Sequence, residues 1–195
     1  MKFSGVEEYL QVKPTPLKPA AGRVLVSVPF FNDPFFNRTV VLLIECTDNN
    51  CVGLIINQPI KFKISQIIKD IHLNDWVYAG GPVMHNTAFG LHNCSICEET
   101  SEILPHVFLG YDDKFISSLE KNEDPYVKFK FFIGYSGWAP NQLEEEILHK
   151  MWVVCNADEE LILETPAELI WEKAVRDLGD DYLHWLQIPE HLSDN

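Results

Sequence analysis

A serine set between glycines is the first feature of this sequence that could do chemistry. Residues 134–147 read GYSGWAPNQLEEEI and follow an aliphatic and aromatic run, which predicts a strand, a turn and an acidic helix. A nucleophile elbow at such a turn has the pattern Gly-x-Ser-x-Gly, because the strained backbone leaves no room for a side chain at either glycine. Here Gly137 follows Ser136 directly, and Trp138 occupies the place of the second glycine. The pattern therefore argues against a serine hydrolase.

The same segment does not match a phosphate-binding loop. It contains neither Gly-x-Gly-x-x-Gly nor a Gly-Lys-Ser/Thr sequence. Asn141 and Glu144 instead have the spacing of a capping box, and two further glutamates follow in the first helical turn. Negative charge there stabilises a helix and repels a phosphate. We expect a self-capped helix with a solvated glutamate face and with Leu143 and Ile147 turned to the core.

The cysteines offer redox or metal chemistry as a second candidate. Cys94 and Cys97 form a Cys-x-x-Cys pair, but strand-like residues surround it, whereas a redox pair usually begins a helix that lowers the thiol pKa. A zinc site needs about four ligands, and the sequence has no second pair of this kind. We expect no metal and no cofactor. Cys46 and Cys51 flank a predicted hairpin tip, where a reducing compartment should keep them as thiols.

Composition limits the classes of partner. The chain has 195 residues, with 15 basic against 29 acidic side chains and a net charge of −14. Nucleic-acid binding draws its affinity largely from Lys and Arg on phosphates, so direct binding of nucleic acid is disfavoured. The first residues lack the apolar core of a signal peptide, and no stretch approaches the ~18 apolar residues of a membrane span. We expect a cytoplasmic protein without a membrane partner.

The elements that must position these residues mix hairpins with single helices. Residues 1–21, with three prolines between 14 and 19, predict an extended N-terminal arm, and residues 22–195 a single domain. Apolar runs and alternation predict strands at 23–28, 39–45, 51–57, 76–83, within 88–110, at 126–134 and at 151–156. Helical spacing predicts helices at 64–71, 112–121, 141–147 and 166–178. This order favours an α+β fold with a mixed sheet.

Both ends of the last helix carry sequence signals. Thr165 is expected as its N-cap, Pro166 as its first residue and Gly179 as its stop. Past that stop, residues 182–186 carry two aromatic and two leucine side chains. This tail either packs back on the domain or contributes to a dimer, so the chain is expected as a monomer or a homodimer.

Several segments together resemble one family. They are GRVLVSVPFFNDPFFNRTVVLLIE (22–45), GLIINQP (53–59), VYAGGPV (77–83), IGYSGWAPNQLEEEI (133–147) and WEKAVRDLG (171–179). In this order they are similar to the AlgH/YqgE family of bacterial proteins, and the resemblance runs from about residue 20 to residue 180. The resemblance implies an α+β domain with a branched, mixed sheet, part of which closes into a small barrel surrounded by helices. Members are often labelled transcriptional regulators, and the family offers no catalytic residue to carry over.

The resemblance also marks a set of motif residues, which are Asp33, Pro34, Phe36, Arg38, Gly53, Asn57, Pro59, Gly80, Gly81, Pro82, Gly134, Gly137, Trp138, Gln142 and Leu143. We expect ten of them to line a shared surface groove: Arg38, Asn57, Pro59, Gly80, Gly81, Pro82, Gly134, Gly137, Trp138 and Gln142. Glycines of this kind serve close packing as readily as ligand binding, and packing is the favoured interpretation. The chain has Gln58 where the family commonly has arginine, so an anion role there is in doubt.

Two functions follow from these observations. The favoured one is a non-enzymatic regulatory or interaction protein that acts through a protein partner or a small ligand. The alternative is a small-ligand-binding domain or an enzyme that uses a groove lined by the Asn-Gln-Pro, Gly-Gly-Pro and Gly-Tyr-Ser-Gly-Trp motifs.

Overall fold

A computed structural model of the chain describes residues 12–13, 15–31, 33, 35–95, 97–189. Ten strands of these residues belong to one branched sheet. They are β1 (Arg23–Ser27), β2 (Val40–Cys46), β3 (Cys51–Ile55), β4 (Pro59–Lys63), β5 (Trp76–Ala79), β6 (Val83–His92), β7 (Thr100–Leu104), β8 (Val107–Gly110), β9 (Phe129–Trp138) and β10 (Trp152–Asn156). The helices are α2 (Ile64–Ile67), α3 (Asp113–Glu120), α4 (Gln142–Leu148) and α5 (Ala167–Asp177), with a π-helical turn η1 (Glu160–Glu164) and a 3-10 helix η2 (Asp180–Gln187).

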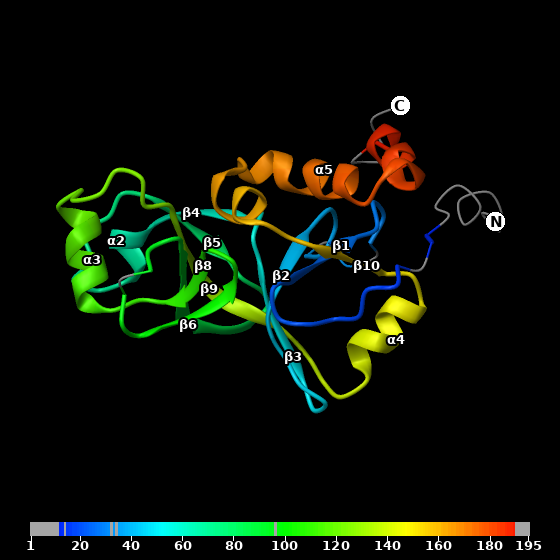
Figure 1. Cartoon of the computed structure of the whole chain (residues 1–195), viewed down its shortest axis with the longest axis horizontal. Helices are drawn as coiled ribbons and strands as arrows, with labels where there is room; N and C mark the ends of the chain where they lie inside the picture. The colour runs from blue at the N-terminus through cyan, green and yellow to red at the C-terminus, as the bar shows by residue number, and fades with distance from the viewer. Residues whose placement is uncertain (1–11, 14, 32, 34, 96, 190–195) are drawn as a thin grey trace.

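The sheet branches at β9. Its main path runs β10-β1-β2-β3-β9-β6-β8-β7, and β5 pairs with β9 in parallel while also pairing with β4. The other strand pairs among the described residues are antiparallel. The α+β class and the branched, mixed sheet are therefore confirmed, and the barrel-like part is a curled half-barrel (Figure 1).

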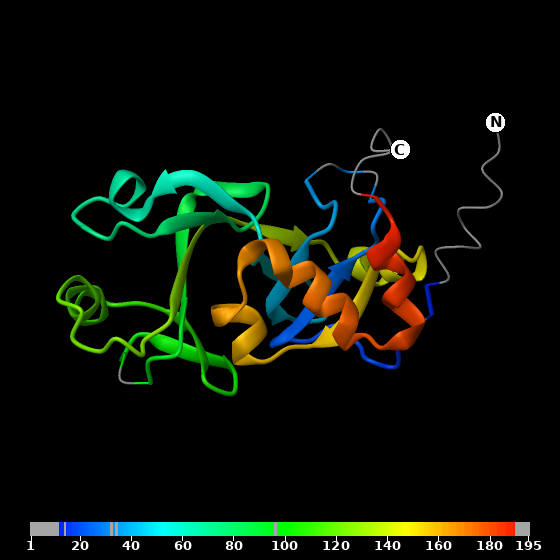
Figure 2. The same cartoon turned by 90° about the horizontal axis from the view of Figure 1, so that it is seen from above.

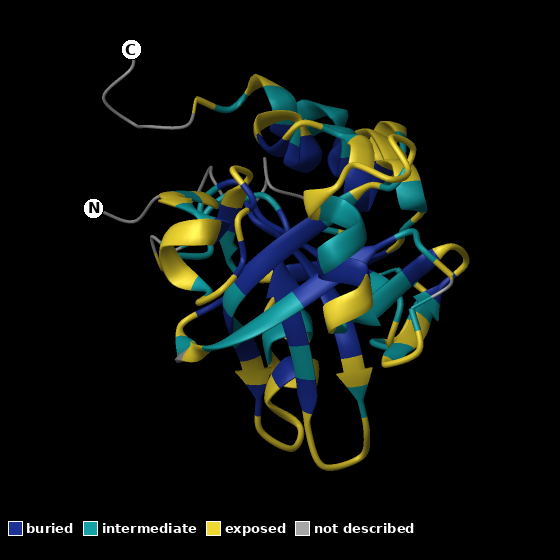
Figure 3. Cartoon of the chain, turned by 90° about the vertical axis from the view of Figure 1, so that its left-hand side faces the viewer, coloured by how far each residue is buried: buried dark blue, intermediate teal, exposed yellow. Residues whose placement is uncertain are grey.

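One half of the molecule, the helical half, contains β1, β2, β3 and β10 with helices on both faces. Figure 1 shows α5 along one face and α4 on the other. Along β1, Val24 and Val26 belong to the core under α5, whereas Leu25 belongs to the core under α4. Both faces are covered, which explains why the strands are almost continuously apolar. Figure 3 shows the same pattern, with dark blue strands at the centre and exposed hairpin tips.

The other half, the half-barrel half, contains β4 to β8 with α2 and α3 (Figures 1 and 2). Its separate core includes Ile64, Val77, Phe115 and Phe131. Strand β9 belongs to both halves, because its first residues pair with β5 and β6 and its last residues pair with β3. The long strand thus carries the GYSGW motif to the boundary between the halves.

The described part of the N-terminal arm lies against the helical half without forming a strand or helix. Thr15 donates its hydroxyl to the carbonyl of Val154 (3.1 Å), and Lys13 forms an ion pair with Asp181 (2.6 Å). Residues 1–11 and 14 of the predicted arm lie outside the described residues. The tail after Gly179 packs back, because Tyr182 and Trp185 are buried in the core under α5.

No helix in the part of the chain that the structure describes has the length and apolar character needed to cross a membrane.

Candidate functional site

The GYSGW motif is a strand and not a turn. Gly134 to Trp138 form the last half of β9, where Trp138 pairs with Cys51 of β3 and Gly137 pairs with Val52. The chain turns only at residues 139–141, so the predicted turn at Ser136 is wrong. Ser136 is 1% exposed, and its hydroxyl donates to the carbonyl of Gly80 at 3.3 Å. Among the described residues, no Lys, Arg or His side chain is hydrogen-bonded to this hydroxyl.

Three of the motif glycines allow the strands to meet closely at the branch. A Cβ atom on Gly80 would lie 2.2 Å from the carbonyl oxygen of Gly134, and one on Gly81 would lie 2.2 Å from the carbonyl carbon of Tyr135. Gly80 also accepts from the amide of Ile55 and donates to the carbonyl of Ile133, both at 2.9 Å. Gly134 has a φ of 72° opposite the register shift of β6. Close packing of backbones explains these glycines without a ligand.

Asn57 and Arg38 are also used inside the fold. The Asn57 side chain accepts from the amide of Val40 (3.0 Å) and donates to the carbonyl of Arg38 (2.9 Å), so it fixes the start of β2. The Arg38 guanidinium lies 4.7 Å from the ring centroid of Trp171 and donates to the carbonyl of Ile188. Pro59 is exposed at the start of β4, opposite Tyr78. Pro34, another motif residue, lies outside the described residues.

A groove of ≈ 670 Å³ lies between the 29–38 loop, the end of β9 and α4. Its lining residues, called the groove from here on, are Phe31, Asp33, Phe36, Pro82, Ser136, Gly137, Trp138, Gln142, Glu146 and Met151. Four of the ten residues predicted for a shared groove meet there, namely Pro82, Gly137, Trp138 and Gln142. The other six, Arg38, Asn57, Pro59, Gly80, Gly81 and Gly134, do not line it.

Aromatic rings form one wall of the groove and its support. The Phe31 and Phe36 ring centroids lie 4.9 and 5.5 Å from that of Trp152, and the Trp138 centroid lies 6.2 Å from it. Trp138 and Trp152 are buried, at 5% and 1% exposure. Tilted and edge-on contacts of this kind stabilise aromatic clusters, so this wall is held in place before any ligand arrives.

Glu146 is the central polar residue of the groove. Its Oε2 accepts from the indole N–H groups of Trp138 and Trp152, each at 2.8 Å. Its Oε1 accepts from the side-chain Nε2 of Gln142 at 2.9 Å. The sequence interpretation of 144–146 as a solvated glutamate face is correct for the exposed Glu144 and Glu145 but wrong for Glu146, which is half-buried. No local sequence pattern indicates this role, because its indole donors lie eight residues before it and six after it, on two different strands.

The start of α4 also differs from the prediction. Asn141 has a φ of 64° and its side chain makes no capping hydrogen bond, so the expected Asn-Glu capping box is absent from this described turn. The Oε1 atom of Gln142 instead accepts from the amide of Ala139 at 3.1 Å. Leu143 is buried and Ile147 packs on the same core, as predicted.

The groove carries two carboxylates and no cation. Asp33 is exposed, and its Oδ1 accepts from the amide of Phe35 at 2.8 Å. Within the described structure, the residues that line the groove include no Lys, Arg or His. The arrangement can bind a positively charged group by its carboxylates and aromatic faces, and it contains no nucleophile with a neighbouring base.

Comparison with known proteins shows which family the chain resembles. The AlgH-like family model matches residues 24–183. The chain belongs to the AlgH-like family. It is 35% identical over 167 residues to a UPF0301 protein of Pseudoalteromonas translucida, which covers 80% of this chain and 90% of that protein. It is 36% identical over 177 residues to a UPF0301 protein of Chlamydia pneumoniae, covering 88% and 93%.

Solved structures agree with this membership. The solution structure of the AlgH protein from Pseudomonas aeruginosa superposes with a TM-score of 0.69 at 26% identity, covering 91% of this chain and 98% of that one. A crystal structure of a protein from Corynebacterium diphtheriae reaches a TM-score of 0.74 at 19% identity, over 91% and 96% of the two chains. The second likeness concerns the fold alone.

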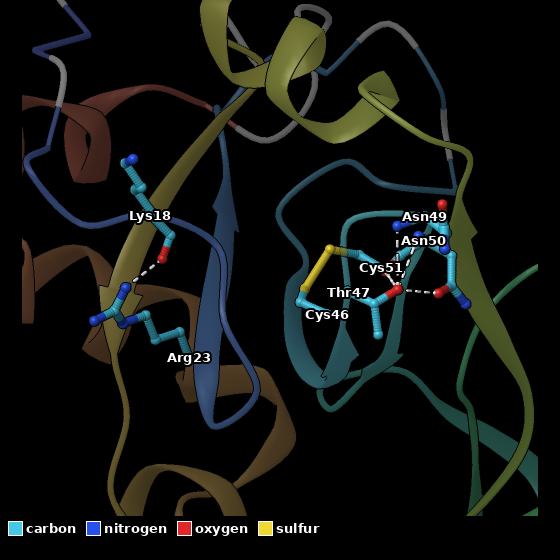
Figure 4. Close-up of a disulfide and its surroundings, with 7 residues drawn as sticks. All are labelled: Lys18, Arg23, Cys46, Thr47, Asn49, Asn50 and Cys51. Carbon is cyan, nitrogen blue, oxygen red and sulfur yellow. Dashed lines mark hydrogen bonds between the residues drawn. A yellow bond between two sulfur atoms is a disulfide. The ribbon is translucent and has the colours of Figure 1, made fainter.

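In this AlgH-like chain, the hairpin cysteines are bonded. Cys46 and Cys51 are directly paired residues of β2 and β3 with Cα atoms 4.2 Å apart, and they form a disulfide (Figure 4). The Thr47 hydroxyl in the tip accepts from the amides of Asn49 and Asn50, both at 3.2 Å. The expectation of free thiols here is therefore corrected, because the strand register brings the two side chains together.

Cys94 and Cys97 follow β6 in the half-barrel half of the AlgH-like fold. Burial raises the pKa of the Cys97 thiol, and a hydrogen bond to the Asp112 side chain acts in the same direction. A reactive redox thiol needs the opposite shift. Within the described residues, no group of three or more His, Cys, Asp and Glu side chains is placed to hold a metal ion. The absence of a metal and a cofactor stays a prediction.

We expect His92 to make the stability of the AlgH-like domain depend on pH. It is fully buried, its ring lies 4.3 Å from that of Phe115, and its Nδ1 accepts from the amide of Cys94 at 3.1 Å. Burial lowers the pKa of His92, partly opposed by backbone hydrogen bonds and Asp112. An unfolded histidine titrates near ~6.5, so the unfolded chain takes up this proton before the folded one as pH falls. Stability contributed by neutral His92 is present above that pH and is lost below it.

Urea unfolding at pH 7 and pH 5 checks this expectation. Wild type should be less stable at pH 5, and His92→Phe should show a smaller difference between the two pH values, though it starts from lower stability because the Cys94 amide loses its acceptor. His106→Phe, a change at an exposed histidine, is the control and should keep the wild-type difference. An unchanged pH difference in His92→Phe would show that another group is responsible.

Proposed function

We propose that this AlgH-like chain is a non-enzymatic interaction protein, which binds a positively charged, partly apolar segment of a partner protein in the groove and acts on that partner as a regulator. One observation carries the proposal: aromatic faces and two carboxylates share a groove that is lined by no cation in the described structure. The family membership is compatible with this role and does not name the partner.

The chemistry of the groove selects for cations. A lysine or arginine group over an aromatic face gains about 0.5–2 kcal/mol, depending on how far it is desolvated. The rim residue Asp33 adds an exposed carboxylate, and within the described residues Oε1 of Glu146 accepts one hydrogen bond. The net charge of −14 also attracts basic partners over a longer range. A basic segment with an aromatic or aliphatic residue satisfies all of these features.

The polar groups of the groove support binding rather than catalysis. Ser136 is buried and bonded to a backbone carbonyl, and Glu146 already accepts from three donors. A general base must reach the proton that it removes, with its acceptor oxygen free to do so. Ser136 is not a base of this kind, and Oε2 of Glu146 already accepts from two indole N–H groups, which favours a non-enzymatic role.

A small organic cation is the second candidate ligand. The groove volume of ≈ 670 Å³ falls within the roughly 300–1,000 Å³ of small-molecule pockets. Carboxylates with aromatic faces are also the usual surroundings of quaternary ammonium groups. This candidate corresponds to the ligand-binding alternative from the sequence, without the enzymatic step.

Met151→Arg is expected to abolish most of the binding. Met151 lines the groove and is 36% exposed, so an arginine there adds a like charge where the ligand's cation should lie. The probe is an amidated heptapeptide of alternating lysine and phenylalanine, and the readout is tryptophan fluorescence on titration. We expect a loss of affinity of at least about tenfold, and weaker binding by wild type at higher salt.

Leu148→Arg is the matched control. It introduces the same charge three residues earlier, at the end of α4, at a side chain that is 79% exposed and outside the groove, and it should bind the peptide as wild type does. A glutamate–phenylalanine peptide should not bind. Equal binding of both peptides, or equal loss in both variants, contradicts the proposal. Binding of tetramethylammonium with no binding of the peptide would favour the small-cation candidate.

The cytoplasmic location, and the absence of direct nucleic-acid binding, stay predictions from the sequence. The peptide binding tested above depends on neither prediction.

A further inference from the structure

The half-barrel half has an exposed basic and aromatic surface of its own, on β4 and β5. Phe62 and Trp76 are 53% and 50% exposed, and the Lys63 Nζ atom lies 3.4 Å from the ring centroid of Trp76. Lys61 is exposed beside them. These four residues are called the basic hairpin below. Within the described structure, neither Lys61 nor Lys63 forms an ion pair.

The backbone edge of the basic hairpin is not suited to pairing with another strand. Within the described residues, β4 pairs only with β5, but it starts with Pro59, carries two lysines and has an irregular register. Proline, lysine and irregular pairing are features that protect an edge strand from strand addition. A partner of this surface must therefore contact its side chains rather than its backbone.

The basic hairpin has the chemistry that the groove selects. It offers the lysines of β4 to the exposed carboxylate of Asp33, and the Trp76 ring, which lies against Lys63, to the groove's apolar wall. Exposed aromatic residues are typical anchors of protein interfaces. Within one copy the two surfaces belong to different halves, so the hairpin of one copy can reach only the groove of another.

The placement of the two surfaces suits a two-fold arrangement. In Figure 2 the β4–α2 segment, in cyan and green-blue tones, and the 29–38 loop, in blue, lie along the same long side of the molecule. A two-fold axis that crosses this side between them would bring each hairpin to the loop of the other copy that holds Phe31, Asp33 and Phe36 of the groove. Such an interface is isologous and closes as a dimer.

We propose that the natural occupant of the groove includes the basic hairpin of a second copy of this chain, in a reciprocal dimer. The inference rests on the proposed function and names one partner for the same groove. A standard protein interface uses about 20–30 residues on each side. One hairpin in one groove supplies fewer than that, but a reciprocal dimer contains this contact twice. The dimer holds both grooves closed, so a basic partner segment competes with dimerisation.

Sedimentation of the full chain over a range of concentrations tests the proposal. We expect a dimer at about 100 µM that dissociates toward about 1 µM, as for a weak interface. Lys61→Glu and Asp33→Lys should each weaken dimerisation at least about tenfold, because each places like charges together. The double variant restores opposite charges in both contacts and should recover dimerisation. Lys128→Glu, which changes an exposed lysine outside the hairpin, is the matched control and should behave as wild type.

Three outcomes would overturn the dimer: a wild-type chain that is monomeric throughout, dimerisation that is insensitive to Lys61→Glu, or a double variant that stays as weak as the single ones. Thermal melting of each variant separates these results from misfolding. A monomeric chain that still binds the lysine–phenylalanine peptide, with Met151→Arg weakened, refutes the dimer and leaves the proposed function standing. A hairpin-dependent dimer that binds no basic peptide refutes the general binding role and retains the self-association.

Discussion

Gly80→Ala is expected to lower the free energy of unfolding by about 3 kcal/mol or more, a large share of the about 5–15 kcal/mol that stabilises a typical domain. The new Cβ atom would lie 2.2 Å from the carbonyl oxygen of Gly134 and 3.0 Å from the Leu54 side chain. The first contact is with backbone, in the place where β5, β9 and β3 meet, so no side chain can move away to relieve it. Separation of the strands would also strain the two backbone hydrogen bonds of Gly80.

Gly137→Ala is the matched control for that result. Gly137 belongs to the same set of motif glycines, but its Cβ would meet only the Tyr135 ring edge at 3.2 Å, which can shift. Urea denaturation of the two variants should show a large loss for Gly80→Ala and a change within about 0.5 kcal/mol for Gly137→Ala. Similar losses in both would mean that the close approach at the branch is not what requires glycine.

Glu146→Ala is expected to cost about 3 kcal/mol of stability and to loosen the groove wall. The substitution removes the acceptor of two indole N–H groups, on the buried Trp138 and Trp152, and an orphaned buried donor costs about 1–3 kcal/mol. Urea unfolding measures the loss, and a red shift of tryptophan emission reports water at the indoles. The stability of Glu146→Gln should lie between those of wild type and Glu146→Ala, because glutamine keeps one acceptor oxygen.

Glu145→Ala is the control for this prediction. Glu145 is exposed on the neighbouring position of α4, and its removal should change stability by less than about 0.5 kcal/mol. If Glu146→Ala and Glu145→Ala were equally mild, the indole hydrogen bonds would contribute little to the fold. Loss of peptide binding in Glu146→Ala without a loss of stability would instead mark Glu146 as a direct ligand contact.

Much of the element order could be predicted from the sequence, because local patterns carry it. The apolar runs of β2 and β3 and the helix at 113–120 were placed correctly, whereas the strand expected at 126–134 lies at 129–138. Helix ends were less accurate. Thr165 was expected as the N-cap of α5 and Pro166 as its first residue, but α5 begins at Ala167. Caps depend on local backbone angles that neighbouring elements impose.

The site was predicted only in part, since it depends on which strands and helices meet. The motif glycines and Trp138 were recognised, but whether residues 134–138 turn or continue as a strand was decided by pairing with β3. Asn57 and Arg38 were expected in a groove. The structure instead shows the Asn57 side chain hydrogen-bonded to the backbone near the start of β2, and the Arg38 guanidinium over the ring of Trp171. Glu146 was missed because its donors, Trp138 and Trp152, converge on it only when α4 packs against the sheet.

The sequence by itself determined the family, the α+β class and the acidic charge, because motif order, apolar periodicity and composition can be read along the chain. The tertiary structure alone decided that Ser136 is a buried strand residue, that Cys46 and Cys51 are bonded, and that an aromatic, acidic groove lies beside α4. These features arise from strand register and from long-range packing, which bring together side chains that no local pattern relates.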